Sequence, residues 1–499
     1  MENFLNLMGG FQVVFTLENI LATVVGAIGG LILGAIPGIG SLAGIALLLP
    51  LTFHFNPTTA IIMLGGIYYS NMYGSAYAAI LLNIPGDSPA IMTTLDGYPM
   101  ATQRGRPGQA LYVSNFSSFI GGTIGIIILT FTGPAFARLG LRFGPPEMTA
   151  LLLVAMTSVA WLLGQNPIKG IIVTLLGILL ASMGFDTLTG SPRFNFGSLY
   201  LMGGIPFIAF VIGAVGFSQV IKLMADRSST VTDVLKKNLT IRGSMLTRDD
   251  VKRLLPPALR AGVVGSFVGV LPGAGATTGA FIGYAVQKPF KSKEPLGTGA
   301  IEGIAAPESA NSACAAGSFA PLLALGLPGS GTGAVLLGGL IMWGLSPGPL
   351  LFERSPDFAW GLISSLYLAN LLTLLVAVCI IPFIIKILAV PTKVMIPVVT
   401  VVCFVGSYSS TNSMFGVLVM LLSAMVGYIL EKNKYPIAPM LLAFVLAPML
   451  ETNMRQAFIA SGGSPVIFFT RPISLTLMIF FFTLILFPIV KGIVSKMRG

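Results

Sequence analysis

Two stretches of this chain read alike, and together they decide its fold. Residues 30–44 read GLILGAIPGIGSLAG, and residues 265–279 read GSFVGVLPGAGATTG. The PGIG motif at 37–40 aligns with the PGAG motif at 272–275, at an offset of 235 residues (272 − 37). Similarity at a fixed offset indicates that one structural unit is present twice in the chain.

A second pair of motifs follows in the same order. GS at 74–75 precedes PGDS at 85–88 by the spacing that separates GS at 317–318 from PGSG at 328–331. The offset here is 243 residues (328 − 85), so the second copy has gained eight residues between its motifs. Two motif pairs in one order predict an internal structural repeat.

The composition places these repeats in a membrane. Hydrophobic residues make up 55% of the 499 residues and charged residues only 9%, whereas soluble domains carry about 25% charged residues. Long apolar runs recur, for example at 150–164, 358–383 and 474–490. Lipid forces every backbone polar group to bond internally, so such runs must be helices. We expect an all-α polytopic membrane protein with about 10–12 membrane segments.

Lys and Arg residues, which favour cytoplasmic loops, orient the two copies. No Lys or Arg precedes Arg104, whereas residues 222–260 hold nine of them. The first copy therefore begins outside and the second inside, which predicts two inverted-topology repeats. The net charge of +11 fits such loops and requires no nucleic-acid partner. The predicted division is an N-terminal segment 1–20, a first membrane half 21–221, a cytoplasmic connector 222–260, and a second membrane half 261–499 with C-terminal helices.

Each stretch around a first-type motif is predicted to form a re-entrant helical hairpin. By their flanking charges, residues 21–51 begin and end outside, and residues 261–287 begin and end inside. Both are too short for two crossings of roughly 20 residues each. Non-helical backbone is tolerated at that depth only inside protein or beside a water-filled cavity. A pair of proline-kinked helices that serves only packing is the alternative.

Signatures of common enzymes are missing from the sequence. It holds no G-x-x-x-x-G-K-[ST] loop and no G-x-S-x-G elbow, and its single histidine, His54, rules out an H-E-x-x-H zinc site. Cys314, Cys379 and Cys403 stand in apolar stretches without metal-ligand spacing, so we expect small core residues. We expect no enzyme, and no cofactor apart from Na⁺ or H⁺ as a coupling ion.

Four Gly-rich helix breaks are the candidate substrate-binding elements. Proline ends the preceding helix, glycine lets the backbone approach a ligand, and the helix that restarts presents free N–H groups to an anion. Hydroxyl groups just past each break can bond a carboxylate or help coordinate Na⁺. Helix packing by small residues is the alternative. The candidate residues are Pro37, Gly38, Gly40, Ser41, Gly86, Ser88, Pro272, Gly273, Gly275, Thr277, Thr278, Gly329, Ser330 and Thr332.

Acidic and amide side chains in apolar surroundings are the candidate cation-coupling residues. Burial of charge in lipid is costly, so such residues are functional candidates by default. Asp87 follows a break, Glu308 and Asn311 lie in APESAN at 306–311, and Asn71 and Asn83 add uncharged polar groups. We expect a Na⁺ ion near Asn311, Glu308 and Asp87. Capping of helix ends, or a place at the membrane edge, is the alternative for these residues.

Other polar and aromatic residues have plainer interpretations. Glu302 stands close to a basic loop and is expected to be exposed at the membrane edge. Glu451 and Arg455 are four residues apart, as in a surface ion pair on a helix. The three tryptophans fit interfacial anchors; they are Trp161, Trp343 and Trp360.

Four stretches of the chain resemble one known family. They read GAIPGIGSLAGIALLLPLTF (34–53), LLNIPGDSPA (81–90), GVLPGAGATTGAFIGYAVQK (269–288) and APESANSACAAGSFAPLLALGLPGSGTGAV (306–335). Their order and spacing are similar to those of the large membrane subunit of tripartite tricarboxylate transporters, the TctA family. The family usually reads Ala-Asn-Asn-Ala where this chain has ANSA at 310–313, a departure at Ser312. By motif match, the signature residues are Pro37, Gly38, Gly40, Pro85, Gly86, Asp87, Pro272, Gly273, Gly275, Glu308, Asn311, Pro328 and Gly329.

The resemblance implies a secondary transporter of the bacterial inner membrane. It implies two partners, a small TctB-like membrane subunit with four helices and a TctC-like periplasmic solute-binding protein. Family substrates are organic carboxylates such as citrate and other di- and tricarboxylates, taken up with Na⁺ or protons. We therefore expect a multi-pass symporter subunit that works by alternating access of its two halves.

Some alternatives stay open at this point. A channel would use similar Gly-rich breaks with rings of charge or carbonyl groups from a homo-oligomer, and an ATP-driven permease subunit would need an ATPase partner. The carried carboxylate, the coupling ion and its stoichiometry, the oligomeric state, and the choice between rocking and elevator motion do not follow from the sequence.

Overall fold

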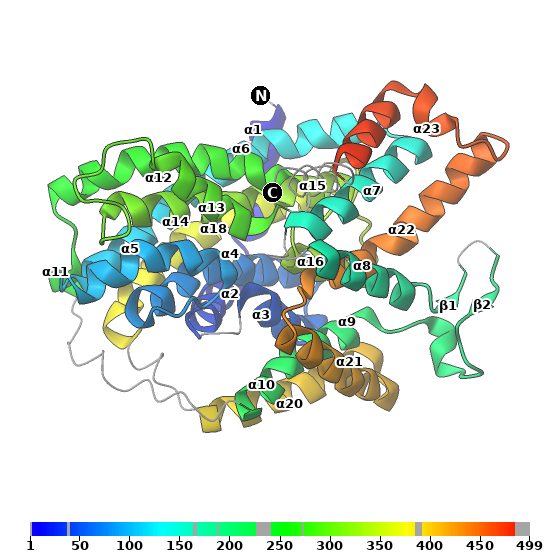
Figure 1. The fold of residues 1–499 in the computed structure, drawn as a ribbon, viewed down its shortest axis with the longest axis horizontal. Coiled ribbons are helices and arrows are strands. Elements are labelled where there is room, and N and C mark those ends of the chain that lie inside the picture. Colours follow the sequence, from blue (N-terminus) through cyan, green and yellow to red (C-terminus); the bar gives the residue numbers. More distant parts are fainter. Residues whose placement is uncertain are drawn as a thin grey trace, which may run out of the picture.

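A computed structural model describes the chain over residues 2–36, 40–162, 167–186, 189–225, 241–271, 274–384 and 392–484. Within these ranges the regular structure is helical except for one small hairpin. That hairpin pairs β1 (Gly184–Phe185) with β2 (Pro192–Arg193) in antiparallel register. The predicted all-α architecture is therefore confirmed (Figure 1).

The first half of the chain forms two groups of helices. The first group is α1 (Glu2–Val14), α2 (Leu17–Ala35), α3 (Gly40–Leu48), η1 (Leu49–His54), α4 (Pro57–Leu82), η2 (Ser88–Ala90), α5 (Ile91–Thr102) and α6 (Pro107–Gly140). The second group is α7 (Pro145–Leu162), α8 (Pro167–Ala181), η3 (Tyr200–Gly203), α9 (Phe207–Val211), the π-helix η4 (Ile212–Phe217) and α10 (Ser218–Ala225).

The second half of the chain also starts with helices that flank two breaks, and it continues to the C-terminal helices. Its first group is α11 (Ile241–Ser244), α12 (Arg248–Val270), α13 (Gly275–Gln287), α14 (Ile301–Gly317), α15 (Phe319–Leu325) and α16 (Gly331–Met342). Its second group is α17 (Leu351–Arg354), α18 (Pro356–Ile380), η5 (Ile381–Phe383), α20 (Thr392–Thr411), α21 (Met414–Lys432), α22 (Ala438–Ala460) and α23 (Ile467–Thr470).

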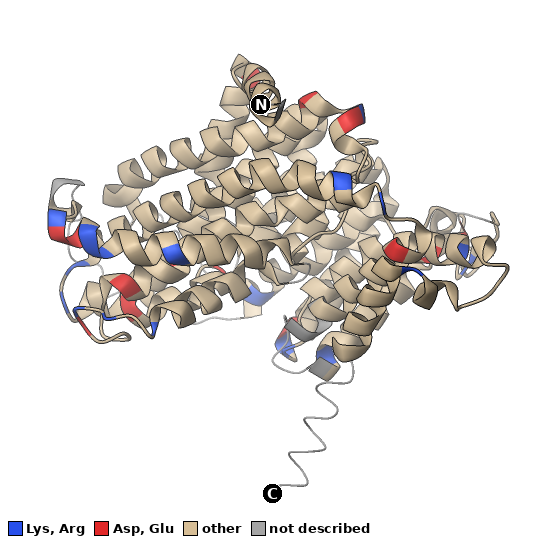
Figure 2. Cartoon of the chain, turned by 90° about the horizontal axis from the view of Figure 1, so that it is seen from above, with Lys and Arg blue, Asp and Glu red and all other residues tan. Residues whose placement is uncertain are grey.

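The helices have the lengths and composition of a membrane protein. Among the described residues, five helices are long and apolar enough to cross a bilayer, at 17–35, 107–140, 207–225, 356–383 and 414–432. Shorter apolar helices occur at 40–54, 168–181, 331–342, 396–411 and 472–484. Charged residues gather toward the ends of the helices, and most of the helical surface between them is uncharged (Figure 2). The chain is a multi-pass membrane protein, as predicted.

Close glycine contacts recur in the two predicted copies. α2 packs along α4 in the first copy, and α12 packs along α14 in the second. A Cβ atom on Gly30 would lie 2.4 Å from the Ile67 carbonyl oxygen, and one on Gly265 would lie 2.3 Å from that of Ala310. The same helix pair is therefore built twice. Equivalent contacts follow one turn later, as Gly34 against Asn71 and Gly269 against Cys314.

The two copies interlock where their helices are broken. The four breaks lie at residues 36–40, 83–87, 271–275 and 326–330, and parts of the first and third fall outside the described residues. α3, which follows the first break, packs against α16, which follows the fourth. η2, which follows the second break, packs against α13, which follows the third. Each half thus packs on the broken elements of the other, while their opposite orientation in a membrane stays a prediction.

The connector joins the second copy through a long helix. Thr247 and Asp250 form a capping box, in which the Thr247 hydroxyl accepts from the Asp250 N–H and the Asp250 carboxylate accepts from the Thr247 N–H. This cap begins α12 at Arg248, inside the range 222–260 assigned to the connector. Burial would raise the pKa of the Asp250 carboxyl, but hydrogen bonds from Thr247 and Arg106 outweigh it and lower that pKa.

Several plain interpretations of single residues need correction. Glu302 is buried, not exposed, because its carboxylate bonds the Arg253 guanidinium at 2.9 Å. Trp360 is buried in the protein and packs edge-on against Phe352, so it is no interfacial anchor. Cys379 is exposed, whereas Cys314 and Cys403 are buried as expected. Glu451 and Arg455 do form the predicted ion pair, although Glu451 also bonds Arg193.

Candidate functional site

The backbone at the breaks adopts left-handed conformations at equivalent positions. Gly40 and Gly275 open α3 and α13 with φ of 59° and 63°. Asn83 and Gly326 close α4 and α15 with φ of 60° and 68°. Glycine adopts this region without steric cost, which explains the glycine in three of the four positions. Four candidate residues of the first and third breaks, Pro37, Gly38, Pro272 and Gly273, lie outside the described residues.

A carboxylate joins the first and second breaks. The Asp87 carboxylate accepts from the Ser41 backbone N–H at 2.8 Å and from the Ser41 hydroxyl at 2.7 Å. Its other oxygen accepts from the Ser88 N–H at 2.7 Å. The Ser41 hydroxyl also lies 3.0 Å from the hydroxyl of Thr332, on the first turn of α16. We call Asp87, Ser41, Ser88 and Thr332 the Asp87 junction, because they connect three of the four breaks.

Two glycines make the Asp87 junction sterically possible. A Cβ atom on Gly40 would lie 3.1 Å from the Asp87 carboxyl carbon, in a backbone conformation that other residues rarely adopt. A Cβ atom on Gly86 would lie 2.0 Å from the Gly34 carbonyl oxygen. The second break is thus held against the backbone of α2 just before the first break, and packing requires the glycines at 40 and 86.

Tyr68 lies between the Asp87 junction and the remaining third break, and sequence reasoning missed it. The phenol is buried on α4, interacts with the side chains of Ser330 and Ser318, and lies near Asp87 and Cys314. The Cys314 thiol in turn donates to the carbonyl oxygen of Gly275 at the third break, with a separation of 3.2 Å. The sequence did contain a signal for this role. The apolar helix α4 carries four tyrosines, and packing alone does not require their hydroxyl groups. These are Tyr68, Tyr69, Tyr73 and Tyr77.

Glu308 lies in a buried polar cluster without a basic partner. It is 1% exposed on α14, and its carboxylate accepts hydrogen bonds from the hydroxyls of Thr93 on α5 and Ser118 on α6, the latter at 3.1 Å. Ser114 also interacts with it. Among the ion pairs of the described residues, none includes Glu308. A buried carboxylate with only neutral donors needs a proton or a cation to offset its charge.

The amides of Asn311 and Asn71 add buried polar atoms. Asn311 follows Glu308 by less than one turn of α14, and Asn71 lies on α4. Both side chains are buried, and neither amide oxygen nor amide nitrogen has a hydrogen-bond partner among the described residues. Buried polar atoms in native proteins are nearly always bonded, so these amides indicate a bound ion, water or ligand.

The other predicted residues have local roles. Asn83 is exposed and ends α4, which is the helix-capping alternative for this residue. The exposed Ser88 contributes its backbone N–H to the Asp87 junction, and the Ser330 hydroxyl caps α16 by accepting from the Gly333 N–H at 3.1 Å. Thr277 and Thr278 are half-buried on the first turn of α13.

A second buried carboxylate escaped the sequence analysis. Asp96 on α5 is fully buried and accepts from the backbone N–H groups of Gly297, Gly299 and Ala300, and from the Tyr284 hydroxyl. It thereby caps the start of α14 from another helix, which favours a structural role. Its partners lie about 200 residues further along the sequence, so no local sequence pattern around Asp96 predicts this contact.

The arrangement can hold charges of both signs inside a helical protein. The N-terminus of α3 holds the Asp87 carboxylate, and α13 begins with equivalent backbone geometry at Gly275. Helix N-termini attract anions, and the Glu308 cluster contains carboxylate, hydroxyl and amide oxygens, which are the kinds of group that bind Na⁺ or carry protons in membrane proteins. Across the described residues, no group of three His, Cys, Asp or Glu side chains is placed to hold a metal ion.

Comparison with known proteins agrees with this architecture. The family model of the tripartite tricarboxylate transporter TctA family matches residues 20–442. An uncharacterized 52.8 kDa protein in the TAR-I ttuC' 3' region of Agrobacterium vitis is 36% identical over 497 residues, which cover 99% of this chain and 98% of that protein. An uncharacterized protein in the TAR-II ttuC' 3' region of the same organism is 38% identical over 234 residues, 46% of this chain and 96% of that protein. No solved structure matches. The chain belongs to the tripartite tricarboxylate transporter TctA family.

Proposed function

We propose that this chain is the substrate-translocating subunit of a cation-coupled uptake system for organic di- and tricarboxylates in the bacterial inner membrane. The chain belongs to a tripartite transporter family, which supports the proposal that it functions together with a small TctB-like membrane subunit and a TctC-like periplasmic solute-binding protein. Its long apolar helices support the proposal that the substrate crosses the membrane through a helical domain of this chain.

The observation that carries the proposal is the Asp87 junction. An alternating-access carrier needs a site between two parts that can move relative to each other. Ser41 and Asp87 come from the first half of the chain and Thr332 from the second, and their side chains meet within hydrogen-bond distance. A substrate bound beside this meeting point, at the start of α13 that packs against η2, would contact both halves, so movement of one half against the other would expose it to opposite sides.

The substrate carboxylate is proposed to bind at the start of α13. The start of α3 already holds the Asp87 carboxylate, and a second negative charge there would be repelled. The residue equivalent to Asp87 in the second half is the uncharged Ser330, so the start of α13 is free of this repulsion. Thr277 and Thr278 supply hydroxyl groups on the first turn of α13.

The coupling ion is proposed to bind in the Glu308 cluster. Na⁺ there would meet the Glu308 carboxylate and the amide oxygen of Asn311, while H⁺ would reside on Glu308 itself. Either ion neutralises the buried carboxylate. Thr93 follows Asp87 by six residues, so the segment that bonds Glu308 begins at the Asp87 junction, which gives a physical route for coupling.

Transport assays test the proposal directly. The chain and its small membrane subunit are reconstituted in proteoliposomes, the binding protein is added outside, and labelled citrate and other di- and tricarboxylates are offered with Na⁺ and pH gradients varied separately. We expect uptake that follows one gradient, together with counterflow exchange of labelled for unlabelled substrate. Flux without counterflow would indicate a channel, and uptake that needs ATP but neither gradient would indicate an ATP-driven permease.

A further inference from the structure

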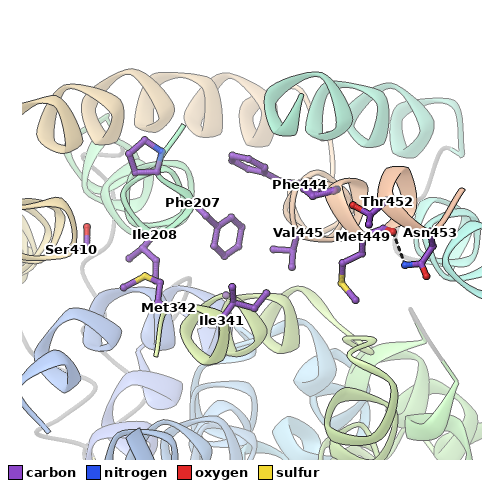
Figure 3. A pocket seen from close by; sticks show the side chains of 13 residues that line it. Phe207, Ile208, Ile341, Met342, Ser410, Phe444, Val445, Met449, Thr452 and Asn453 are labelled. Carbon is purple, nitrogen blue, oxygen red and sulfur yellow. Dashed lines mark hydrogen bonds between the residues drawn. The ribbon is translucent and has the colours of Figure 1, made fainter. Parts of the chain in front are cut away.

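An apolar cavity of about 650 Å³ lies outside the breaks and the Glu308 cluster. It is enclosed by α9, α16 and α22, and its walls include Phe207, Ile341, Met342, Phe444, Val445 and Met449 (Figure 3). The Phe207 ring packs edge-on against Phe444 with their centroids 5.4 Å apart. Gly338 allows this arrangement, because a Cβ atom there would lie 2.3 Å from the Phe207 ring.

The chemistry of the lining excludes an ionic ligand. No Lys, Arg, His, Asp or Glu is among the lining residues. The Asn453 amide donates to the Met449 carbonyl oxygen at 2.8 Å (Figure 3), and the Ser410 hydroxyl donates to that of Ser407 at 2.9 Å. Apolar cavities stay dry and take apolar ligands. A carboxylate would lose its hydration here and gain no positive partner.

The cavity lies at the ends of its helices. The membrane-length helix at 207–225 begins at the cavity with Phe207 and reaches Lys222 near its other end. Met342 is the last residue of α16, and Ser410 lies next to the end of α20. The predicted orientation, with Lys222 on the cytoplasmic side, puts the cavity in the non-cytoplasmic half of the membrane domain.

The mouth of the cavity is open to the surface between these helices. Ile341 and Met342 are 51% and 45% exposed, although both are large apolar residues. At the depth of membrane-spanning helices, the solvent around such side chains is the hydrocarbon of the bilayer. An apolar cavity that opens there adjoins lipid tails, which match its lining.

An ion-pair cluster stands beside one end of the cavity. Thr452 and Asn453 line that end, and the preceding residue, Glu451, bonds Arg193 at 2.7 Å and Arg455 at 2.6 Å. Both guanidinium groups remain partly exposed. Asp186 pairs with both arginines as well, so the cluster holds two positive and two negative charges. Charged side chains mark the level where a helix leaves the hydrocarbon, which places a lipid headgroup at the level of this cluster.

We propose that this cavity is a binding site for one acyl chain of a phospholipid from the non-cytoplasmic leaflet. The chain lies between α9, α16 and α22, with its headgroup at the level of Arg193 and Arg455. Since Thr332 of the Asp87 junction lies on the first turn of α16, the lipid packs against the helix that connects the two halves.

Photolabelling tests the lipid site. The protein is purified in nanodiscs that contain a phospholipid with a diazirine at the end of one acyl chain, irradiated, digested and mapped by mass spectrometry. We expect adducts concentrated on Met342, Val445 or Met449. Val445→Trp fills the cavity and should reduce these adducts by about tenfold, equivalent to about 1.4 kcal/mol of binding. Ile341→Trp at the mouth is a second variant for the case that Val445→Trp fails to fold.

A matched control and two outcomes decide the question. Leu422→Trp adds the same ring on α21, at a side chain that is 58% exposed and outside the cavity, and should leave the adducts unchanged. Adducts spread evenly over all lipid-facing helices, or unaffected by either cavity variant, would overturn the proposal. So would loss of the adducts when the small membrane subunit is purified with the chain, because the cavity would then be a seat for that subunit.

Discussion

The two broken-helix copies share a backbone and differ in the side chains that it carries. In both copies the second helix starts with a left-handed glycine, Gly40 or Gly275, and the close helix contacts occur at equivalent glycines. Membrane helices approach closely only where side chains are small, so these positions are fixed by shape. The duplicated part of the molecule is therefore its framework.

The charged side chains are not duplicated. Asp87 in the first copy corresponds to Ser330 in the second, and Ser41 corresponds to Ala276. Glu308 in the second copy corresponds to Gly65 in the first. Asp87 at a break of the first copy and Glu308 inside a helix of the second copy therefore have no counterpart in the other copy. The comparison teaches that one framework, used twice, can hold carboxylates at different places.

The largest predicted effect tests the framework at two equivalent glycines. Gly86→Ala would place a methyl group 2.0 Å from the Gly34 carbonyl oxygen, whereas Gly329→Ala would place one 3.2 Å from the Ser318 Cβ. We expect Gly86→Ala to abolish uptake and lower the melting temperature, since overpacking costs about 1–3 kcal/mol or more. Gly329→Ala should fold and transport nearly normally. Uptake in proteoliposomes and thermal unfolding of the purified variants measure both.

The comparison of the two glycine variants tests whether the second and fourth breaks are packed differently. If Gly86→Ala and Gly329→Ala melt at the same temperature and transport equally, the second and fourth breaks are packed alike. The close contact between Gly86 and Gly34 would then not distinguish the two copies, and the comparison drawn from it would be wrong.

The next effect concerns the charge that only the first copy has at its break. Asp87→Asn keeps the shape but removes the negative charge that accepts from Ser41 and Ser88. Hydrogen bonds to charged groups contribute about 1.5–3 kcal/mol each, so we expect uptake to fall by about tenfold or more. Ser330→Ala, the equivalent change in the second copy, removes one helix cap, which contributes about 1 kcal/mol of stability. This variant should therefore take up substrate measurably faster than Asp87→Asn.

The substrate affinity of Asp87→Asn tests where the substrate carboxylate binds. With the carboxylate proposed at the start of α13, Asp87→Asn should leave the substrate concentration for half-maximal uptake within about twofold, less than 1 kcal/mol. A clear gain in affinity would mean that Asp87 competes with the substrate, and would move the proposed site to the start of α3.

A smaller and more specific effect is expected for the carboxylate of the second copy. Thr93 and Ser118 bond different oxygens of Glu308, so Glu308→Gln keeps an acceptor for one of them, but it neither carries a proton nor attracts a cation. We expect uptake to lose its dependence on the driving ion, measured by separate titration of Na⁺ and pH. Glu302→Gln is the control, because Glu302 is also buried but paired with Arg253. An unchanged ion dependence in Glu308→Gln would remove Glu308 from coupling.

The sequence predicts the framework of this protein better than its site. The repeat, the helical breaks and the membrane class follow from local motifs and composition, and the structure or the family match confirms the class. The bond between Asp87 and Ser41 could not be predicted, because it joins residues 46 positions apart across two breaks. Thr93 and Ser118 look like ordinary hydroxyl residues of apolar helices until tertiary packing brings them to Glu308.

The smallest predicted effect tests the hydrogen bond that crosses between the copies. Ser41→Ala and Thr332→Val each remove one hydroxyl of that bond, while the Ser41 backbone N–H continues to donate to Asp87. A double-mutant cycle on thermal stability should give a coupling energy of about 0.5–1.5 kcal/mol, the usual net value of one hydrogen bond. If the halves separate during transport, this bond must break before the substrate moves, so Thr332→Val should not slow counterflow exchange, whereas Ser41→Ala also removes the hydroxyl that donates to Asp87. Additive losses of stability would mean that Ser41 and Thr332 do not act as a pair, and the connection between the copies would then rest on the packing of α3 against α16.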